Sequence, residues 1–299
     1  KTLGPYGTVV NHLPDAAMAE IKVPKGDVPQ EFCCAASGRP LFYPVVTDQG
    51  IAYCYSVLFQ MFMSSSTGAP KCVVTGEPIT FFPNVCVPLH HFMLDVYKKD
   101  LKGRKQIEET IMAEHGLKVP SVSDAPDEDG DDGFMEEFTC PVSKTLVFQP
   151  CCLSSGTIVS ALSIPPGGFK KDPNRLIACA LHGQAPKKSP VLESMIRTKF
   201  PSQYKALESK HGGVEILDQP THREFGADEY VHLGLGCDGC GMWPIRGMAY
   251  EDVDCRSSTG FHLCQGCYDL GYHKRVLGGR FNQGHMPKNS MVVIINSDY

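Results

Sequence analysis

The chain has 299 residues, of which 42% are hydrophobic and 20% are charged, values that are ordinary for globular domains of modest size. Its net charge of −5 comes from residues 124–137, which hold eight acidic residues and no basic one, and this balance disfavours a nucleic-acid-binding surface. No run approaches about eighteen apolar residues and no apolar signal region opens the chain, so we expect neither a membrane span nor a signal peptide.

Cysteine is abundant, with 14 residues in a chain that shows no secretory signal. This combination favours a reducing compartment and metal binding over a disulfide framework, and it predicts a cytoplasmic or nuclear protein. The chain begins with Lys1 and not with methionine, which indicates that a further segment precedes it.

The first 29 residues are interpreted as an N-terminal extension, and residues 30–118 as a first module with its helix. Short apolar pieces separated by Gly and Pro turns lead into a helix over residues 53–63. A second helix is predicted from Leu89 to Val96, because its apolar residues recur at helical spacing. The lysines and Arg104 that follow are expected to continue this helix as a solvated face.

Residues 119–136 are too acidic and too poor in large apolar side chains to offset the entropy of ordering, so they are predicted to be a disordered linker. The first module then recurs over residues 137–206, with a helix at its end. Residue types repeat at a spacing of 106 along the chain, in the pairs Phe32 and Phe138, Ser37 and Ser143, Phe42 and Phe148, Pro44 and Pro150, and Gly50 and Gly156. A polar linker over residues 207–229 follows.

Residues 230–299 contain two Cys-x2-Cys pairs separated by 23 residues, Cys237 with Cys240 and Cys264 with Cys267. Four thiolates in two such turns can close a tetrahedral zinc site. Disulfides, buried apolar cysteines and a thioredoxin-like redox motif are the alternatives, and the last requires a βαβ pattern that the sequence does not show. We therefore predict one zinc ion on these thiolates.

The order CDGCGMWPIRGMAY, then a cysteine, then GFHLCQGCY and GRFNQGH, resembles a ZZ-type zinc finger. The resemblance implies a second zinc site from a middle pair and two terminal histidines. Only Cys255 and His285 of that set are present, with Asp252 and Asn289 at the other two positions. Since Asp can bind zinc through oxygen, the second site is left open, with Asp252, Cys255 and His285 as its candidate ligands.

The phrases CPVS, YPVVTDQGIAY, QPCCLSSGTIV and CVVTGEPI resemble the U-box, the zinc-free relative of the RING domain. This resemblance implies that each repeat recruits a ubiquitin-conjugating enzyme through two loops. The first-loop contact would be Ala36 in repeat one and Val142 in repeat two, while Val73 and Ala180 replace the second-loop proline. The alternative is that both repeats are scaffolds whose apolar residues are core.

Two such modules followed by a ZZ finger with GRFNQ resemble the plant-type N-recognin ubiquitin ligases, which bind aromatic N-terminal residues of their substrates. The resemblance implies that Asp238 binds a substrate ammonium and that Trp243 and Phe261 form an apolar wall. An Asp inside a Cys-x2-Cys turn can instead cap backbone amides, and the two aromatic residues can equally form the core of a small domain.

The predicted fold is therefore α+β, with two RING/U-box-like ββα modules, each followed by a helix, and a zinc-stabilised ZZ finger. The predicted function is a ubiquitin ligase whose partners are a ubiquitin-conjugating enzyme and a protein substrate with an exposed N-terminus, with no nucleic-acid or membrane partner. The ligase would act by proximity and orientation. The alternative is an inactive adaptor with a zinc-dependent peptide-binding module.

Overall fold

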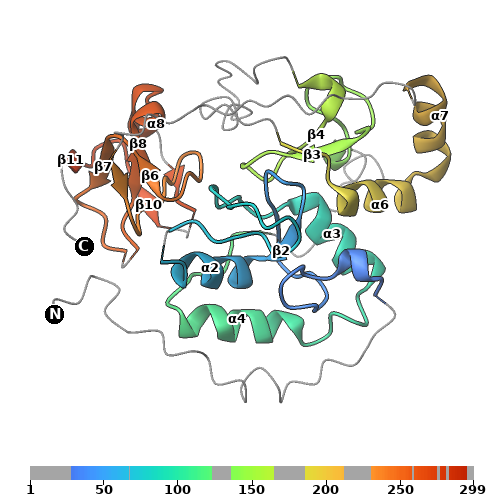
Figure 1. Cartoon of the computed structure of the whole chain (residues 1–299), viewed down its shortest axis with the longest axis horizontal. Helices are drawn as coiled ribbons and strands as arrows, with labels where there is room; N and C mark the ends of the chain where they lie inside the picture. Colours follow the sequence, from blue (N-terminus) through green and yellow to red (C-terminus); the bar gives the residue numbers. More distant parts are fainter. Residues whose placement is uncertain are drawn as a thin grey trace.

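The computed structural model describes residues 28–66, 68–122, 136–164, 186–211, 230–257, 259–274, 277–280 and 283–294. It combines short helices with small antiparallel sheets, so the α+β class is as predicted (Figure 1). Most of the predicted N-terminal extension and acidic linker, and the greater part of the 207–229 linker, lie outside the described residues. None of the described helices is long and apolar enough to cross a membrane.

The first repeat begins with a short 3-10 helix, η1, and a β-hairpin that leads directly into a buried helix. Its strands β1 and β2 pair in the register Val45 with Tyr53. Helix α2 begins at Tyr55, two residues later than predicted, because Tyr53 belongs to β2. The elements of this repeat are η1 (Gln30–Phe32), β1 (Pro44–Val46), β2 (Ala52–Cys54), α2 (Tyr55–Met63), α3 (Val87–Val96) and α4 (Arg104–Glu114).

The predicted continuation of the second helix is wrong, because α3 ends at Val96 and a separate helix starts at Arg104. Between them the chain turns at Gly103, whose φ of 84° is a left-handed conformation that glycine adopts without strain. Arg104 is also not on a solvated face. It is 1% exposed and forms an ion pair with Glu108, which accepts a hydrogen bond from Ser56 on α2. This buried pair joins α4 to α2.

The second repeat contains the same backbone hydrogen bonds at the same spacing of 106. The amide of Tyr55 donates to the carbonyl of Tyr43, and that of Ala161 donates to that of Gln149. Tyr43 and Gln149 share a positive φ, at 44° and 49°. The elements here are β3 (Pro150–Cys152), β4 (Ile158–Ser160), η2 (Ala161–Ser163), α6 (Pro190–Lys199) and α7 (Pro201–His211), of which α7 extends five residues into the predicted linker.

The two repeats pack against each other through reciprocal contacts. The amide of Asn84 in repeat one donates to the carbonyl of Ser154 in repeat two, at 2.8 Å. The amide of Lys187 in repeat two donates to the carbonyl of Asp48 in repeat one, at 2.7 Å. Asp48 and Ser154 are equivalent positions of the two repeats, so the contacts form an approximately two-fold joint, called here the inter-repeat joint.

Glycine is required on both sides of this joint. A Cβ atom on Gly50 would lie 2.4 Å from the carbonyl oxygen of Lys188, and one on Gly156 would lie 2.2 Å from that of Val85. Both glycines have a positive φ, at 79° and 83°. The repeated glycine of the sequence therefore serves the packing of one repeat on the other as well as the turn of its own hairpin.

Four turns in the described part of the chain share one pattern of backbone hydrogen bonds, and we call them knuckle turns. In each, the amide of a cysteine donates to the carbonyl five residues later, and the amide four residues later donates back to the cysteine carbonyl. The fourth residue after each cysteine has a positive φ. The cysteines are Cys34, Cys72, Cys140 and Cys237.

The C-terminal module is built from very short strands around the fourth knuckle turn. Its largest sheet has the strand order β11-β7-β8, and two further hairpins pair β5 with β6 and β9 with β10. Its elements are β5 (Val231–His232), β6 (Ile245–Arg246), β7 (Ala249–Asp252), β8 (His262–Cys264), α8 (Gln265–Asp269), η4 (Tyr272–Lys274), β9 (Leu277–Gly278), β10 (Gly284–His285) and β11 (Met291–Ile294).

The C-terminal module and the first repeat exchange aromatic side chains between their cores. Trp243 of the module packs on Phe62 and Phe82 of repeat one, at ring separations of 5.2 and 6.1 Å, and belongs to the core of the repeats. In return, Phe81 of repeat one belongs to the core of the module. An antiparallel bridge between Phe81 and Met242 joins the two backbones, so the module lies against α2 and the adjoining chain (Figure 1).

Candidate metal centre

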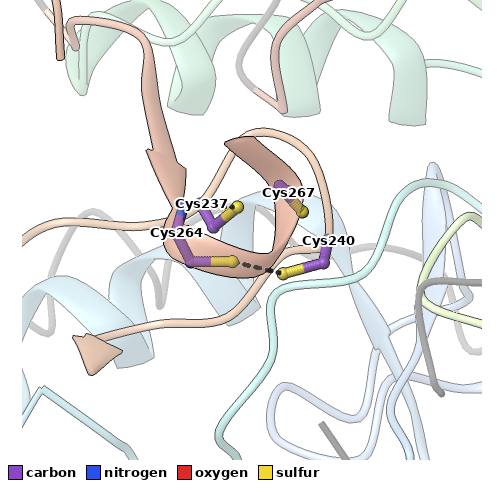
Figure 2. Close-up of side chains that lie close together, drawn as sticks. All are labelled: Cys237, Cys240, Cys264 and Cys267. Carbon is purple, nitrogen blue, oxygen red and sulfur yellow. Dashed lines mark hydrogen bonds between the residues drawn. The ribbon is translucent and has the colours of Figure 1, made fainter. Parts of the chain in front are cut away.

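Four cysteine side chains converge at the fourth knuckle turn, as the sequence predicts. The sulfur atoms of Cys237, Cys240, Cys264 and Cys267 all lie within 4.8 Å of one another, and each residue is 2% exposed or less. Figure 2 shows the two pairs facing each other, with Cys264 at the end of β8 and Cys267 on α8. Among the residues that the structure describes, these four are the only group that could hold a metal ion.

Glycines allow this close approach of the two pairs. A Cβ atom on Gly239 would lie 2.7 Å from the sulfur of Cys267, so any larger residue would separate the pairs. Gly241 closes the knuckle turn at a φ of 84°, and its amide donates to the carbonyl of Cys237 at 2.8 Å. The amide of Cys264 donates to the sulfur of Cys237 at 3.3 Å, which ties the second pair to the first.

The charge state of the cluster favours a cation. Burial raises the pKa of Cys240 well above the ordinary value of a thiol, and hydrogen bonding with Cys237 does the same for Cys267. These two thiols therefore resist ionisation by themselves, whereas a bound cation makes each of the four cysteines a thiolate ligand. The sulfurs of Cys240 and Cys264 are 3.8 Å apart, far beyond the roughly 2.05 Å of a disulfide. The donor set therefore fits a tetrahedral metal ion.

The three candidate ligands of a second zinc ion do not form a metal-binding group in the described part of the chain. His285 is fully buried, and its Nδ1 lies 2.7 Å from a carboxylate oxygen of Asp252. Its Nε2 lies 2.8 Å from the carbonyl oxygen of His273. Both ring nitrogens of His285 therefore lie within hydrogen-bonding distance of oxygen atoms of the protein.

Asp252 has a second hydrogen-bond partner, and the His285 ring has an aromatic neighbour. The side chain of Asn289 donates to Asp252 at 2.8 Å, and the ring of Phe261 stacks on that of His285 at 4.6 Å. Cys255 remains half-buried in the turn after β7. The structure does not bring Asp252, Cys255 and His285 together as one ligand group, and the second zinc site stays a prediction of the sequence.

Asp238 caps backbone amides. The sequence left this role open as the alternative to binding a substrate ammonium. One carboxylate oxygen accepts the amide of His262 at 2.8 Å. The other accepts the amide of Arg280 and the side-chain amide of Gln283, each at 2.8 Å. Burial raises the pKa of Asp238 to about 7, although these hydrogen bonds act in the opposite direction. The residue is 8% exposed and holds Arg280 and Gln283 against the knuckle turn.

The two aromatic residues predicted to line an N-terminus pocket lie in different cores. Trp243 is 5% exposed and packs into the first repeat, whereas Phe261 is fully buried inside the C-terminal module. They do not form a shared wall beside Asp238. Arg280 and Gln283, both within the GRFNQ sequence, directly contact the knuckle turn, and no motif in the sequence predicted this role for them.

The predicted contacts for a conjugating enzyme are exposed. Ala36 is exposed on the first knuckle turn, and Val142 is 41% exposed on the equivalent turn of repeat two. The second knuckle turn adds Val73 and Val74, which are 54% and 62% exposed. Val74 lines a cavity of about 540 Å³ together with the first knuckle turn, so the two turns are neighbours. Ala180 lies outside the described residues.

The chain is similar to several curated ubiquitin ligases. It is 26% identical over 180 residues to the E3 ubiquitin-protein ligase PRT1 of Arabidopsis thaliana, a match that covers 52% of this chain and 43% of that protein. A shorter match, 37% identical over 54 residues, relates it to the human E3 ubiquitin-protein ligase HERC2 and covers 18% of this chain and 1% of HERC2.

A third match, 40% identical over 42 residues, relates the chain to the human E3 ubiquitin-protein ligase ZSWIM2, and it covers 14% of this chain and 6% of that protein. The chain therefore matches less than half the length of each of these relatives. No family model and no solved structure matches it.

Proposed function

We propose that this chain acts in ubiquitin transfer, with its repeats binding a ubiquitin-conjugating enzyme and its C-terminal module binding the substrate. The observation that carries the proposal is the exposure of apolar side chains on two neighbouring knuckle turns of repeat one, Ala36 on the first and Val73 and Val74 on the second. Exposed valines at the tips of rigid turns are suited to protein binding. The similarity to three E3 ubiquitin-protein ligases supports the same assignment.

In this proposal the chain supplies position and not a nucleophile. The knuckle cysteines of the repeats, Cys34, Cys72 and Cys140, are 2% exposed or less, so a ubiquitin thioester could not reach them without unfolding the turn. Catalysis would come from holding the charged conjugating enzyme close to a substrate lysine. The packed joint between the repeats supports this role because it sets the directions in which both sets of turns point.

For the cysteine cluster we propose zinc as the metal. Four buried thiolates in two Cys-x2-Cys pairs are typical of structural zinc, which would supply a cross-link between the knuckle turn and α8 and no reaction chemistry. Cysteines that stay reduced fit the cytoplasm or the nucleus, where we propose the protein acts.

Recognition of a substrate N-terminus is the finer proposal for the C-terminal module. Asp238 is a carboxylate inside the knuckle turn, and an ammonium could bind it by replacing the donor group of Gln283. Gln283→Ala would then strengthen binding of a peptide with a free aromatic N-terminus, while the same peptide acetylated at its N-terminus would bind neither form. Equal binding of free and acetylated peptides would contradict N-terminus recognition. Both can be measured by calorimetry with the zinc-loaded chain.

The docking proposal is tested by ubiquitin transfer with a panel of charged conjugating enzymes. Val74→Arg and Val142→Arg each place a charge on one repeat, and the repeat that binds the enzyme should lose at least about tenfold in rate, equivalent to about 1.4 kcal/mol. Met248→Arg is the matched control, since Met248 is 49% exposed on the C-terminal module. Transfer that survives both repeat variants together would overturn the docking proposal and favour an adaptor.

A further inference from the structure

Arg280 lies where the C-terminal module meets both repeats. It is 8% exposed, and its Nη1 donates to the carbonyl of Phe82 at 3.2 Å and the side-chain oxygen of Asn84 at 3.0 Å, both in repeat one. The same Nη1 donates to the carbonyl of Ser154 in repeat two at 2.5 Å. Its Nη2 donates to the carbonyl of Gly239, inside the knuckle turn of the metal centre, at 3.0 Å. One guanidinium thus contacts all three parts of the molecule.

The backbone of Arg280 is held as firmly as its side chain. Its amide donates to Asp238 in the knuckle turn at 2.8 Å, and its carbonyl accepts the hydroxyl of Tyr55 at 2.8 Å. A Cβ atom on Gly241 would lie 3.0 Å from the guanidinium carbon, so this glycine leaves room for it. Three residues of a single knuckle turn therefore determine where the guanidinium lies.

The acceptors of Arg280 in the repeats belong to one half of the inter-repeat joint. Ser154 accepts both the amide of Asn84 and the guanidinium of Arg280. The other half, in which Lys187 donates to Asp48, has none of these contacts to Arg280. The backbone hydrogen bonds of the joint are approximately two-fold. The contacts of Arg280 are not, because they reach the half that contains Asn84 and Ser154.

We propose that Arg280 is a positioning residue that couples metal binding at the cysteine cluster to closure of the inter-repeat joint. The metal orders the knuckle turn, and the turn presents Gly239 and Asp238 to Arg280. Arg280 then holds Asn84 and Ser154 together. When the metal is removed the turn loses its cross-link, Arg280 loses two of its partners, and this half of the joint opens. Coupling of this kind is reciprocal, so an open joint also weakens metal binding.

Residue-resolved amide hydrogen exchange of the full chain tests the proposal with and without zinc, and with and without Arg280→Ala. In the zinc-loaded wild type we expect slow exchange at Asn84, and removal of zinc by a chelator should accelerate it at least tenfold. In zinc-loaded Arg280→Ala the Asn84 amide should already exchange that fast, and the chelator should add little. The chelator effect must therefore depend on Arg280, as in a double-mutant cycle.

An internal control comes from Phe82, whose amide donates to Gly241 in the knuckle turn. This amide should stay protected in zinc-loaded Arg280→Ala, whereas general loosening of the module would expose it together with that of Asn84. Arg280→Lys keeps the charge but carries its donor hydrogens on one nitrogen, so it cannot reach all the partners of the guanidinium. It should give an intermediate exchange rate at Asn84. It also replaces the alanine variant if that variant does not hold zinc.

The proposal is overturned if Asn84 exchange is the same with and without zinc in the wild type. It is also overturned if both Arg280 variants hold zinc and protect Asn84 as the wild type does. Neither readout involves ubiquitin or a conjugating enzyme, so these outcomes are independent of the function proposed above.

Discussion

The metal centre and the repeats are built on the same knuckle turn but stabilise it differently. In the C-terminal module the third residue after Cys237 is another cysteine, Cys240, and a second pair faces it. In the repeats the third residue carries a hydroxyl, namely Ser37 after Cys34, Thr75 after Cys72 and Ser143 after Cys140. The backbone hydrogen bonds are the same in all four turns. In the repeats the turn forms around one cysteine and a hydroxyl residue, whereas in the C-terminal module a metal ion would hold the turn to the second cysteine pair.

The pKa values of the cysteine thiols shift in opposite directions in the two kinds of turn. Burial would raise the pKa of Cys72 and Cys140, but hydrogen bonds from Thr75 and Ser143 and from nearby amides outweigh it. The pKa of Cys72 is lowered, and that of Cys140 falls to about 7. In the metal centre, by contrast, burial raises the pKa of Cys240. Donors stabilise a lone thiolate, whereas a group of thiols needs a cation.

The largest expected effect separates the two kinds of turn by metal content. Cys264→Ala removes one of four ligands, so the chain should lose its zinc and with it most of the folding free energy of the C-terminal module, on the order of 10 kcal/mol. Cys140→Ala alters a turn without a metal and should leave the zinc content at one ion per chain. Metal analysis after gel filtration measures both. Zinc retained by Cys264→Ala would show that the cluster is not the site.

Within the C-terminal module, the hydrogen-bonded group of Asp252, His285 and Asn289 should contribute stability without a metal, as the turns of the repeats do. His285→Ala leaves the buried carboxylate of Asp252 without its main partner and should cost about 3 kcal/mol of unfolding free energy. Zinc content should stay at one ion per chain, because His285 lies outside the four-cysteine cluster. Asn289→Ala, which removes a weaker donor to the same carboxylate, should cost about 1 kcal/mol. A parallel loss of zinc in His285→Ala would contradict this account.

The carboxylate of Asp252 also makes the stability of the C-terminal module depend on pH in the acidic range. Although burial raises it, the pKa of Asp252 is lowered overall by hydrogen bonds from Asn289 and His285. A lowered folded-state pKa stabilises the fold above the unfolded value, about 3.9, and this stabilisation is lost as the pH falls through the folded value. The wild type should therefore lose stability below about pH 4 more steeply than Asn289→Ala, as denaturant titrations can measure.

Alanine substitutions at the glycines that close two knuckle turns test how much the atoms around each turn affect stability. Gly241→Ala adds a Cβ atom 2.4 Å from the carbonyl oxygen of Phe82 at a φ of 84°, so both strain and a backbone clash oppose it. We expect a loss of about 3 kcal/mol. Gly38→Ala has a similar φ of 66° but meets no atom within 4 Å, so it should cost only about 1 kcal/mol. Equal losses in thermal unfolding would mean that contact with Phe82 does not matter.

The smallest effect concerns the hydroxyl that replaces a second cysteine. Ser143→Ala should cost about 1 kcal/mol and raise the pKa of Cys140 towards its ordinary value. Because the folded-state pKa of Cys140 is lowered to about 7, the wild type should gain stability between about pH 7 and the unfolded value near 8.5. That gain should shrink in Ser143→Ala. It should persist in Ser155→Ala, whose hydroxyl contacts Thr157.

The repeat was visible in the sequence because each turn depends on residues close together in the chain. Gly50 and Gly156 mark equivalent hairpin turns, and Phe32 and Phe138 mark equivalent core positions. The helix boundaries were less accurate, because residues 97–103 form turns and only the end of the basic run, from Arg104, belongs to α4. The burial of Arg104 depends on Glu108 and on Ser56 of another helix, and helical periodicity carries no sign of the latter.

Cysteine spacing in the sequence determined the ligands of the metal centre, because two Cys-x2-Cys pairs form a local pattern that is typical of one tetrahedral metal site. Only the tertiary structure decided that Asp238 is enclosed, that Trp243 packs into the first repeat, and that Arg280 joins three modules. These contacts link residues up to 225 positions apart, as between Tyr55 and Arg280. A buried polar group takes whichever partners the packed chain brings to it, and local pattern does not encode that choice.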